Sequence, residues 1–137
     1  MNLTVSHVPV DYVHQVWPSV QGFIENALKF GGDDYTIDQA KMYIADGSWL
    51  LLVASDEEKN IHGACAVKML NMPNYRVAFV IAIGGKLISN DETFAQLCGL
   101  LKFFGATRIQ GVARESIARL WKRYGFKERY TLVEVEI

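Results

Sequence analysis

Residues 108–126, RIQGVARESIARLWKRYGF, decide the fold class of this chain. Their opening predicts a strand over Thr107–Val112, and their second half predicts an amphipathic helix near Ser116–Tyr124 that Gly125 ends. A final strand is predicted over Lys127–Ile137 because apolar and acidic residues alternate there, which buries one face and leaves the other wet. The alternating residues are Val133, Glu134, Val135, Glu136 and Ile137. Strand, helix, strand at the end of a small chain indicates an α/β domain.

The upstream residues predict two early helices, three consecutive strands and a long helix. The first helix covers 13–28, where Pro18 is expected to introduce a kink or a restart. Thr36 and Gln39 have capping-box spacing, which opens a second helix that ends at Gly47. The remaining predicted elements are strands near Leu3–Val5 and at Trp49–Ser55, Ile61–Leu70 and Arg76–Ile83, a break at Gly84-Gly85, and a helix over Asp91–Phe104. The predicted order is β-α-α-β-β-β-α-β-α-β.

Length and composition indicate one domain over residues 1–137. Half of the residues are hydrophobic and 21% are charged, which is typical of a soluble globular protein. No apolar run approaches the ~20 residues that cross a bilayer, and the N-terminus does not resemble a secretory signal. Cys65 and Cys98 lie inside apolar segments without metal-ligand spacing, so we expect buried free thiols in a reducing, intracellular compartment and no metal site.

Charge is distributed unevenly although the net charge is only −1. Residues 1–75 hold nine acids against four bases, whereas residues 108–129 hold seven bases against two acids. The bases of this second region are Arg108, Arg114, Arg119, Lys122, Arg123, Lys127 and Arg129. The region is interpreted either as a solvated helix face with a subunit contact, or as a surface for a phosphate-bearing cofactor or nucleic acid.

The element order resembles that of the GNAT (GCN5-related N-acetyltransferase) family over essentially the whole chain. Val16-Trp17-Pro18, Gly84-Gly85 and Tyr124-Gly125-Phe126 resemble more narrowly the small GNAT-like proteins of tailed phages and prophages. The resemblance implies a mixed, mostly antiparallel central sheet with helices on both faces. It also implies acetyl-CoA as cofactor, and no metal.

In the family, a loop of the type Arg/Gln-x-x-Gly-x-Gly/Ala before the long helix holds the CoA pyrophosphate on backbone amides. The matching positions here offer Gly84, Gly85 and Lys86 as a candidate anion nest, but the Gly-x-Gly spacing is missing. Asp91 and Glu92 stabilise the start of the helix and would repel a diphosphate there. The alternative interpretation is an ordinary strand end followed by a well-capped helix.

The resemblance also implies catalytic and acceptor positions. The family's Tyr, a general acid for the departing thiolate, lies four residues before Gly-Phe, which is Trp121 here; Tyr124 has suitable chemistry one turn later. The family's Asn aligns with Arg114, a candidate cofactor contact. The strand over 76–83 holds no carboxylate base. The acceptor-loop candidates are Asp33, Asp34 and Tyr35.

Three functions follow from these observations. The first is an acetyl-CoA-dependent N-acetyltransferase acting on a small amine or a protein acceptor. The second is a GNAT-like fold without catalysis, serving as a phage structural or accessory protein that binds other phage structural proteins. A homo-oligomer is compatible with either of these functions. The third is a nucleic-acid-binding module using the basic region. The expected location is the host cytoplasm or the virion, with no membrane partner.

Overall fold

A computed structural model describes residues 2–137 and places five strands in one sheet in the order β1-β2-β3-β4-β5. Neighbouring strands are antiparallel from β1 to β4, and β5 runs parallel to β4. The strands are β1 (Thr4–Val8), β2 (Leu50–Ser55), β3 (Ile61–Asn71), β4 (Arg76–Gly85) and β5 (Arg108–Gly111). The α-helices are α1 (Val13–Leu28), α2 (Ile37–Ala45), α3 (Asp91–Phe103) and α4 (Glu115–Lys122), with 3-10 turns at Val10–Tyr12 and Lys29–Gly31. The mixed α/β fold class is confirmed.

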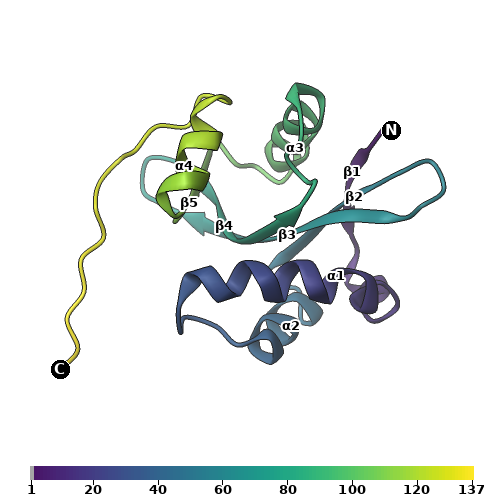
Figure 1. The fold of residues 1–137 in the computed structure, drawn as a ribbon, viewed down its shortest axis with the longest axis horizontal. Coiled ribbons are helices and arrows are strands. Elements are labelled where there is room, and N and C mark those ends of the chain that lie inside the picture. Colours follow the sequence, from purple (N-terminus) through teal and green to yellow (C-terminus); the bar gives the residue numbers. More distant parts are fainter. Residues whose placement is uncertain (1) are drawn as a thin grey trace.

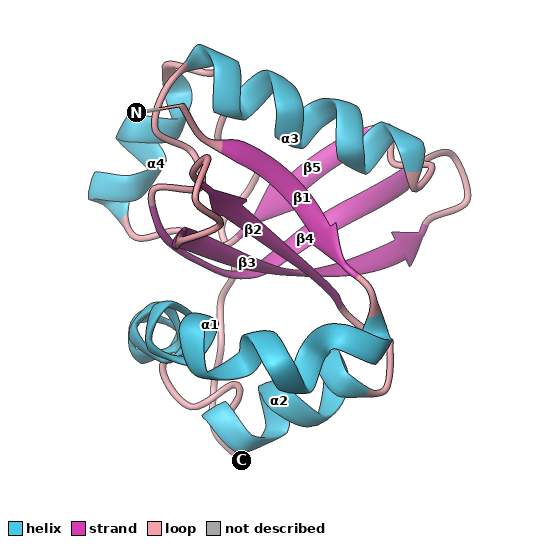
Figure 2. Ribbon diagram, turned by 90° about the vertical axis from the view of Figure 1, so that its right-hand side faces the viewer, coloured by secondary structure: helices cyan, strands magenta, loops and turns pink. Residues whose placement is uncertain are grey.

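Helices cover both faces of the sheet (Figure 1). One apolar cluster joins α1 and α2 to one face and contains Trp17, Ile24 and Leu51. The other joins α3 and α4 to the opposite face and contains Leu52 and Leu97. Successive β2 residues therefore point into different cores, which explains why that strand is apolar throughout. Figure 2 shows the three layers from the side.

The helix starts follow the predicted capping. Thr36 accepts a hydrogen bond from the Gln39 amide at 3.2 Å, and the Gln39 side chain accepts one from the Thr36 amide at 3.0 Å. Asn90 caps α3 by accepting from the Thr93 amide at 2.9 Å. Of the two predicted effects of Pro18, a restart of the helix was wrong, because α1 continues through this residue. Pro18 lies on the exposed side of α1, where water can satisfy the carbonyl that loses its partner.

The end of β4 also differs from the prediction. Gly84 and Gly85 do not break the strand; they are its last two residues and pair with Ala64 and Gly63 of β3. Strand β5 is shorter than predicted and ends at Gly111. The two neighbouring strands therefore have unequal lengths, and this difference positions the candidate site.

The predicted final strand was wrong. Residues 127–137, called the C-terminal arm, are extended but unpaired, and they project away from the body of the protein (Figure 1). Alternation of apolar and polar residues suits a strand, but a strand also needs a neighbouring edge to bond with. No other segment of the described residues lies in register with the arm.

Two further expectations concern compartment and membrane. Within residues 2–137, no helix combines the length and the apolar character needed to cross a bilayer. Cys65 is a buried free thiol whose pKa is raised by burial, and Cys98 is a half-buried free thiol. The sequence predicted free thiols at both positions, because both cysteines belong to apolar segments.

Candidate functional site

The two parallel strands separate before β4 ends. Val77–Val80 of β4 pair with Arg108–Gly111 of β5, but β4 continues to Gly85 while the chain after Gly111 turns toward α4. Residues 81–85 consequently have β3 on one side and no strand on the other. This β4–β5 divergence, defined by residues 81–85 and 112–114, leaves one row of backbone groups without a strand partner.

Helix α1 packs directly onto the last residues of β4. A Cβ at Gly84 would lie 2.7 Å from the Phe23 carbonyl oxygen. A Cβ at Gly85 would lie 2.7 Å from Cε1 of the Phe23 ring and would overlap the His62 carbonyl oxygen. Both glycines are therefore required by close approach of backbone, and φ of Gly85 is +68°. These contacts give the glycines a structural role at the edge of the site.

Several of the amides that follow β4 already have acceptors inside the protein. The Lys86 amide donates to the His62 carbonyl at 2.8 Å. The Ser89 and Asn90 amides donate to the Thr93 hydroxyl at 3.0 and 3.2 Å, and the Thr93 amide donates to Asn90 Oδ1. Amides occupied in this way cannot also bind a phosphate without breaking these bonds.

The β4–β5 divergence suits the pantetheine chain of acetyl-CoA better than its diphosphate. The unpaired side of residues 81–85 suits an extended pantetheine chain, which can bond with backbone groups as a strand does. The diphosphate does not fit as well, since the Lys86, Ser89 and Asn90 amides are occupied and Asp91 and Glu92 are exposed at the start of α3. Those carboxylates occupy the positive end of the helix dipole.

The candidate catalytic residues on and after α4 lie against the second core. Trp121 is buried, and its ring would lie 3.3 Å from a Cβ at Gly111, the last residue of β5. Tyr124 is half-buried and packs against Phe94 of α3, with ring centroids 5.0 Å apart and ring planes tilted by 37°. Trp121 is a packing residue beside the divergence, whereas Tyr124 has a hydroxyl that can exchange a proton.

Arg114 connects the two sides of the molecule. It precedes α4 as the N-cap residue, and its guanidinium lies 3.8 Å from the ring centroid of Phe30 in the loop after α1. This cation–π contact brings the candidate cofactor contact beside the candidate acceptor loop. Asp33 and Asp34 are exposed in the same loop.

Tyr35 lies between that loop and the first core. Its ring packs edge-on against Trp49 at 4.8 Å and against Tyr43 at 6.3 Å. Beside it is a hollow of about 210 Å³ whose lining includes Glu25 and Lys29. The hollow is smaller than the ~300–1,000 Å³ of typical ligand pockets, so it suits a side chain rather than a whole cofactor.

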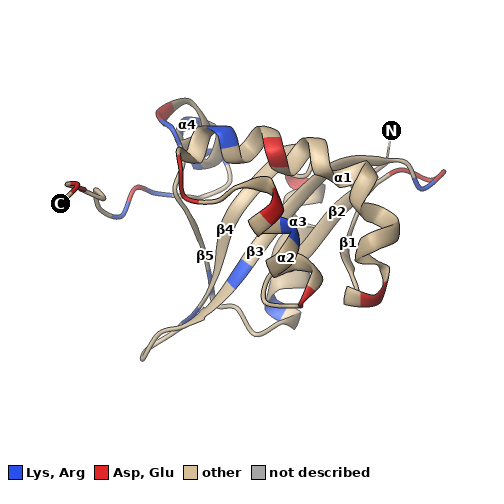
Figure 3. Cartoon of the chain, turned by 90° about the horizontal axis from the view of Figure 1, so that it is seen from below, with Lys and Arg blue, Asp and Glu red and all other residues tan. Residues whose placement is uncertain are grey.

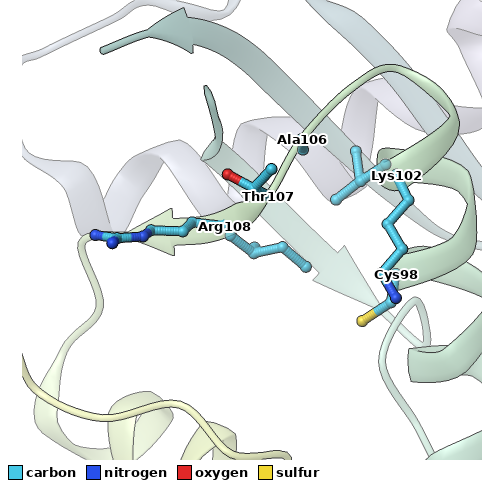
Figure 4. Close-up of a pocket in the computed structure, with 7 residues that line it drawn as sticks. Cys98, Lys102, Ala106, Thr107 and Arg108 are labelled. Carbon is cyan, nitrogen blue, oxygen red and sulfur yellow. The ribbon is translucent and has the colours of Figure 1, made fainter. Parts of the chain in front are cut away.

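A second hollow, of about 120 Å³, lies at the start of β5 and is lined by residues such as Cys98, Lys102 and Thr107. Figure 4 shows Lys102 near Cys98 and Arg108 pointing away from both. Burial raises the pKa of the Cys98 thiol, which leaves it protonated and a poor nucleophile. This hollow is distinct from the β4–β5 divergence and carries no catalytic group.

His62, isolated in sequence, has a partner in the structure. Its Nε2 lies 2.8 Å from Oδ2 of Asp56, at the turn between β2 and β3. Asp56 also accepts hydrogen bonds from the amides of Glu58 and Asn60. These bonds, with that from His62 the largest, lower the pKa of Asp56 to about 2. The pair stabilises the turn next to the strand that supports Gly85.

The contribution of Asp56 to the free energy of unfolding is expected to decrease at acid pH. The folded pKa of Asp56 lies below the unfolded value of about 3.9, so its contribution is complete above that pH and is lost as the pH falls toward 2. Urea unfolding midpoints of the wild type and of Asp56→Ala, measured from pH 5 to pH 2, are expected to converge as the pH falls. A constant difference across that range would contradict this assignment.

The sequence did not indicate Phe23 or Phe30 as parts of the site. Phe23 follows the helical periodicity of α1 like any core residue, and nothing local shows that its backbone touches Gly84. Phe30 is 64% exposed, and a large aromatic residue in a Gly- and Asp-rich loop was the one available signal.

Figure 3 shows basic residues at α4 and charges of both signs along the arm.

Comparisons with solved structures identify the fold. No family model and no curated protein matches the chain in sequence. In structure, it is similar to a ribosomal-protein-alanine N-acetyltransferase from Brucella melitensis biovar Abortus 2308 (TM-score 0.70, 14% identity, 99% of each chain covered). It is also similar to a predicted acetyltransferase with acetyl-CoA from Clostridium acetobutylicum (TM-score 0.65, 14% identity, 98% of this chain and 96% of that one).

A third similar structure is an aminoglycoside acetyltransferase from an uncultured soil metagenomic sample, with a TM-score of 0.67 and 15% identity. The match covers 100% of this chain and 99% of that one. At such identities the likeness concerns the fold and not the activity. The chain therefore has the fold of the GNAT acetyltransferases.

Proposed function

We propose that this chain is an N-acetyltransferase-like protein that uses acetyl-CoA and acts on an amine. The single observation that carries the proposal is the β4–β5 divergence, where residues 81–85 keep an unpaired backbone edge inside a GNAT fold. A similar structure, the predicted acetyltransferase from Clostridium acetobutylicum, is described with acetyl-CoA. The divergence offers backbone groups to an extended thioester chain between two strands of the sheet.

The pantetheine arm is the part of the cofactor that this site is suited to hold. It would lie along residues 81–85 and leave the diphosphate near Lys86, where the Lys86 side chain is exposed. The occupied amides and the two carboxylates of Asp91 and Glu92 weaken that end of the site. We therefore expect binding dominated by the pantetheine arm, unlike a site built around a diphosphate loop.

Bound acetyl-CoA would supply the thioester carbonyl that an amine attacks, with the thiol as the leaving group. Tyr124 is the residue we assign to hold the proton that the departing sulfur takes up. Asp33 and Asp34 would attract a cationic amine toward the loop that Arg114 contacts through Phe30. Trp121 takes no proton-transfer role in this assignment and packs beside the divergence.

Ligand-induced stabilisation tests the proposal. Millimolar acetyl-CoA is expected to raise the melting temperature by about 4 °C, as a ligand with a Kd near 0.1 mM does for a chain of this size. S-acetyl-pantetheine, which lacks the nucleotide, is expected to bind within about tenfold of acetyl-CoA, since one diphosphate contact is worth roughly that factor. No shift with either compound at millimolar concentration would eliminate the enzyme proposal.

The double variant Asp91→Asn/Glu92→Gln provides a matched control. Removing two negative charges from the start of α3 is expected to strengthen acetyl-CoA binding by about threefold to tenfold and to leave S-acetyl-pantetheine unchanged. An equal change for both compounds would show that the carboxylates do not face the diphosphate.

Turnover tests the role of Tyr124. Tyr124→Phe is expected to lower kcat about 100-fold with little change in melting temperature, because the ring contact with Phe94 is retained. The control is Tyr130→Phe, since Tyr130 is 77% exposed on the arm. Equal kcat values for the two variants would remove Tyr124 from the mechanism.

A second candidate is a phage-encoded structural or accessory protein with this fold and no catalysis. The occupied amides after β4 and the packing role of Trp121 favour it, as does the exposed apolar arm. Absence of CoA binding together with detection of the protein in purified virions would support this candidate. A nucleic-acid-binding role is supported less, because Trp121 is buried and Tyr124 is stacked, which leaves α4 without an aromatic residue free to stack on bases.

A further inference from the structure

The sheet face that carries α1 and α2 continues beyond these helices. Figure 3 looks onto this face and shows β3, β4 and β5 running past both helices toward the β3–β4 hairpin. The apolar core under the helices includes Ala66 of β3 and Ile81 of β4, and among residues 2–137 it contains no residue nearer the hairpin on either strand. The hairpin half of this face therefore lies outside the helix layer and its core.

Strand pairing determines which side chains lie on this half of the face. Ala78 and Val80 belong to the opposite core, so Phe79 between them lies on the α1/α2 face. Phe79 is paired with Lys68 of β3 and with Gln110 of β5, and paired residues share a face. Phe79 and Gln110 are half-buried and Lys68 is exposed. An aromatic ring is thus flanked by a cation and an amide across three neighbouring strands.

A second aromatic residue, Tyr75, lies four positions earlier. Two arginines share its ring: the guanidinium carbon of Arg108 is 3.6 Å from the ring centroid, and that of Arg129 is 5.6 Å from it. Arg108 precedes Gln110 by two residues in β5 and so lies on the same face. We call this surface the open sheet face, and its members are Lys68, Tyr75, Phe79, Arg108, Gln110 and Arg129.

The open sheet face is locally cationic, although the chain has a net charge of −1. Strands β3, β4 and β5 contain no Asp or Glu. Within residues 2–137, Lys68, Arg108 and Arg129 form no ion pair. The acid next to Arg129 in sequence, Glu128, lies 3.3 Å from Lys122 instead. Two guanidinium groups over one ring repel each other, so a bound anion would remove an existing cost.

The contact with Tyr75 also prepares Arg108 for a phosphate. A guanidinium held over a ring has already lost much of its side-chain freedom, so less is lost when a ligand binds. Its N–H groups point outward around the rim of the plane, where they can donate to phosphate oxygens. The plane itself is a surface on which a base can stack.

Aromatic rings combined with cations on a flat sheet suit single-stranded nucleic acid. Tyr75 and Phe79 are about 13 Å apart along the chain, and aromatic residues on such a sheet stack two or three bases. A duplex keeps its bases stacked inside, and the open sheet face has no helix that enters a major groove. An acidic peptide would satisfy the cations but would leave the aromatic surfaces unused.

We propose that the open sheet face binds single-stranded nucleic acid. Bases stack on Phe79 and on the Tyr75–Arg108 pair, and the Gln110 amide bonds with a base edge. Phosphates contact the three cations of the face. The basic residues of α4 are not part of this surface. The inference goes beyond the proposed acetyl transfer and holds whether or not the β4–β5 divergence binds acetyl-CoA.

Fluorescence anisotropy of a labelled oligothymidylate of about 12 nucleotides tests the proposal. At roughly 50 mM salt we expect a Kd of about 10 µM, which rises about 20-fold at roughly 200 mM salt because three phosphate contacts give a salt slope near −2. A duplex of the same length is expected to bind about tenfold more weakly, since its bases cannot stack on the sheet. Electrostatic attraction alone predicts the reverse, because a duplex has the higher charge density.

Three variants separate stacking from charge. Phe79→Leu keeps an apolar side chain but loses the ring, so binding should weaken about tenfold with the salt slope unchanged. Lys68→Gln/Arg108→Gln should weaken binding about tenfold or more and reduce the slope by about 1.4. Arg119→Gln/Arg123→Gln removes the same charge from exposed positions on and after α4, and should change the Kd less than about twofold.

Several results would overturn the proposal. They are an absence of binding at about 100 µM protein in low salt, equal affinity for duplex and single strand, and equal losses in the two double variants. Displacement of the oligonucleotide by poly-glutamate at the same concentration of charge would also overturn it and would assign the face to an acidic protein segment. Melting temperatures within about 3 °C of the wild type show that the variants remain folded. If Phe79→Leu does not fold, the two double variants and the duplex decide the outcome.

Discussion

Replacing Gly85 with alanine is expected to lower the free energy of unfolding by about 3–5 kcal/mol, the largest effect of any small substitution near the site. Its φ of +68° is unfavourable for a residue with a side chain. The added Cβ would also overlap the His62 carbonyl oxygen and lie 2.7 Å from the Phe23 ring. A backbone carbonyl inside a sheet cannot move aside, so the end of β4 would have to detach from β3 or from α1.

Gly32→Ala is the control for this prediction. Gly32 has a similar φ of +71°, but a Cβ there would meet no atom within 4 Å. With ψ at −124°, Gly32 lies outside the left-handed helical region, and only a backbone cost of about 1–3 kcal/mol is expected. Urea unfolding followed by tryptophan fluorescence measures both variants. Equal losses would show that the close approach at Gly85 does not constrain the end of β4.

The second large effect is expected at Trp121. Trp121→Ala should cost about 3–5 kcal/mol, because the ring is 8% exposed and fills the space above Gly111. It also packs against Phe126, with ring centroids 5.2 Å apart, and so holds the start of the arm. Its loss would leave a cavity where α4, β5 and the arm meet.

Two further variants, one at Leu120 and one at Trp121 itself, serve as comparisons for Trp121→Ala. Leu120→Ala should cost less than about 1 kcal/mol, because Leu120 is 41% exposed. Trp121→Tyr is expected not to raise acetyl-transfer activity above that of the wild type, since the weak diphosphate end of the site is the larger deficit. A kcat that Trp121→Tyr raises above the wild-type value would reverse our ranking of these two defects.

Most of the fold follows from periodicity and capping in the sequence. The apolar stripe of α1, the capping box at Thr36, and the strand runs of β2 to β4 were sufficient to predict the element order up to α4. These signals are local, so they do not depend on knowing the partner of each element. The arm failed as a prediction because alternation specifies a strand face and not a neighbouring edge.

The site could be predicted only in part, because its contacts join residues far apart in sequence. The two glycines at the end of β4 suggested an anion nest, whereas in the structure Phe23 of α1 packs on Gly84. The contact between Arg114 and Phe30 crosses from one face of the molecule to the other. Crossing angles and loop paths decide such contacts, and neither is encoded in a local pattern.

The most direct test of our central claim is an NMR titration of the uniformly ¹⁵N-labelled protein with acetyl-CoA. If the β4–β5 divergence binds the thioester chain, amide shifts should change mainly in residues 81–85 and 111–115, with smaller changes at Ser89 and Asn90, whose amides already have acceptors. Shifts confined to the hollow beside Cys98, or an unchanged spectrum at millimolar ligand, would contradict the claim that this strand separation is a cofactor site.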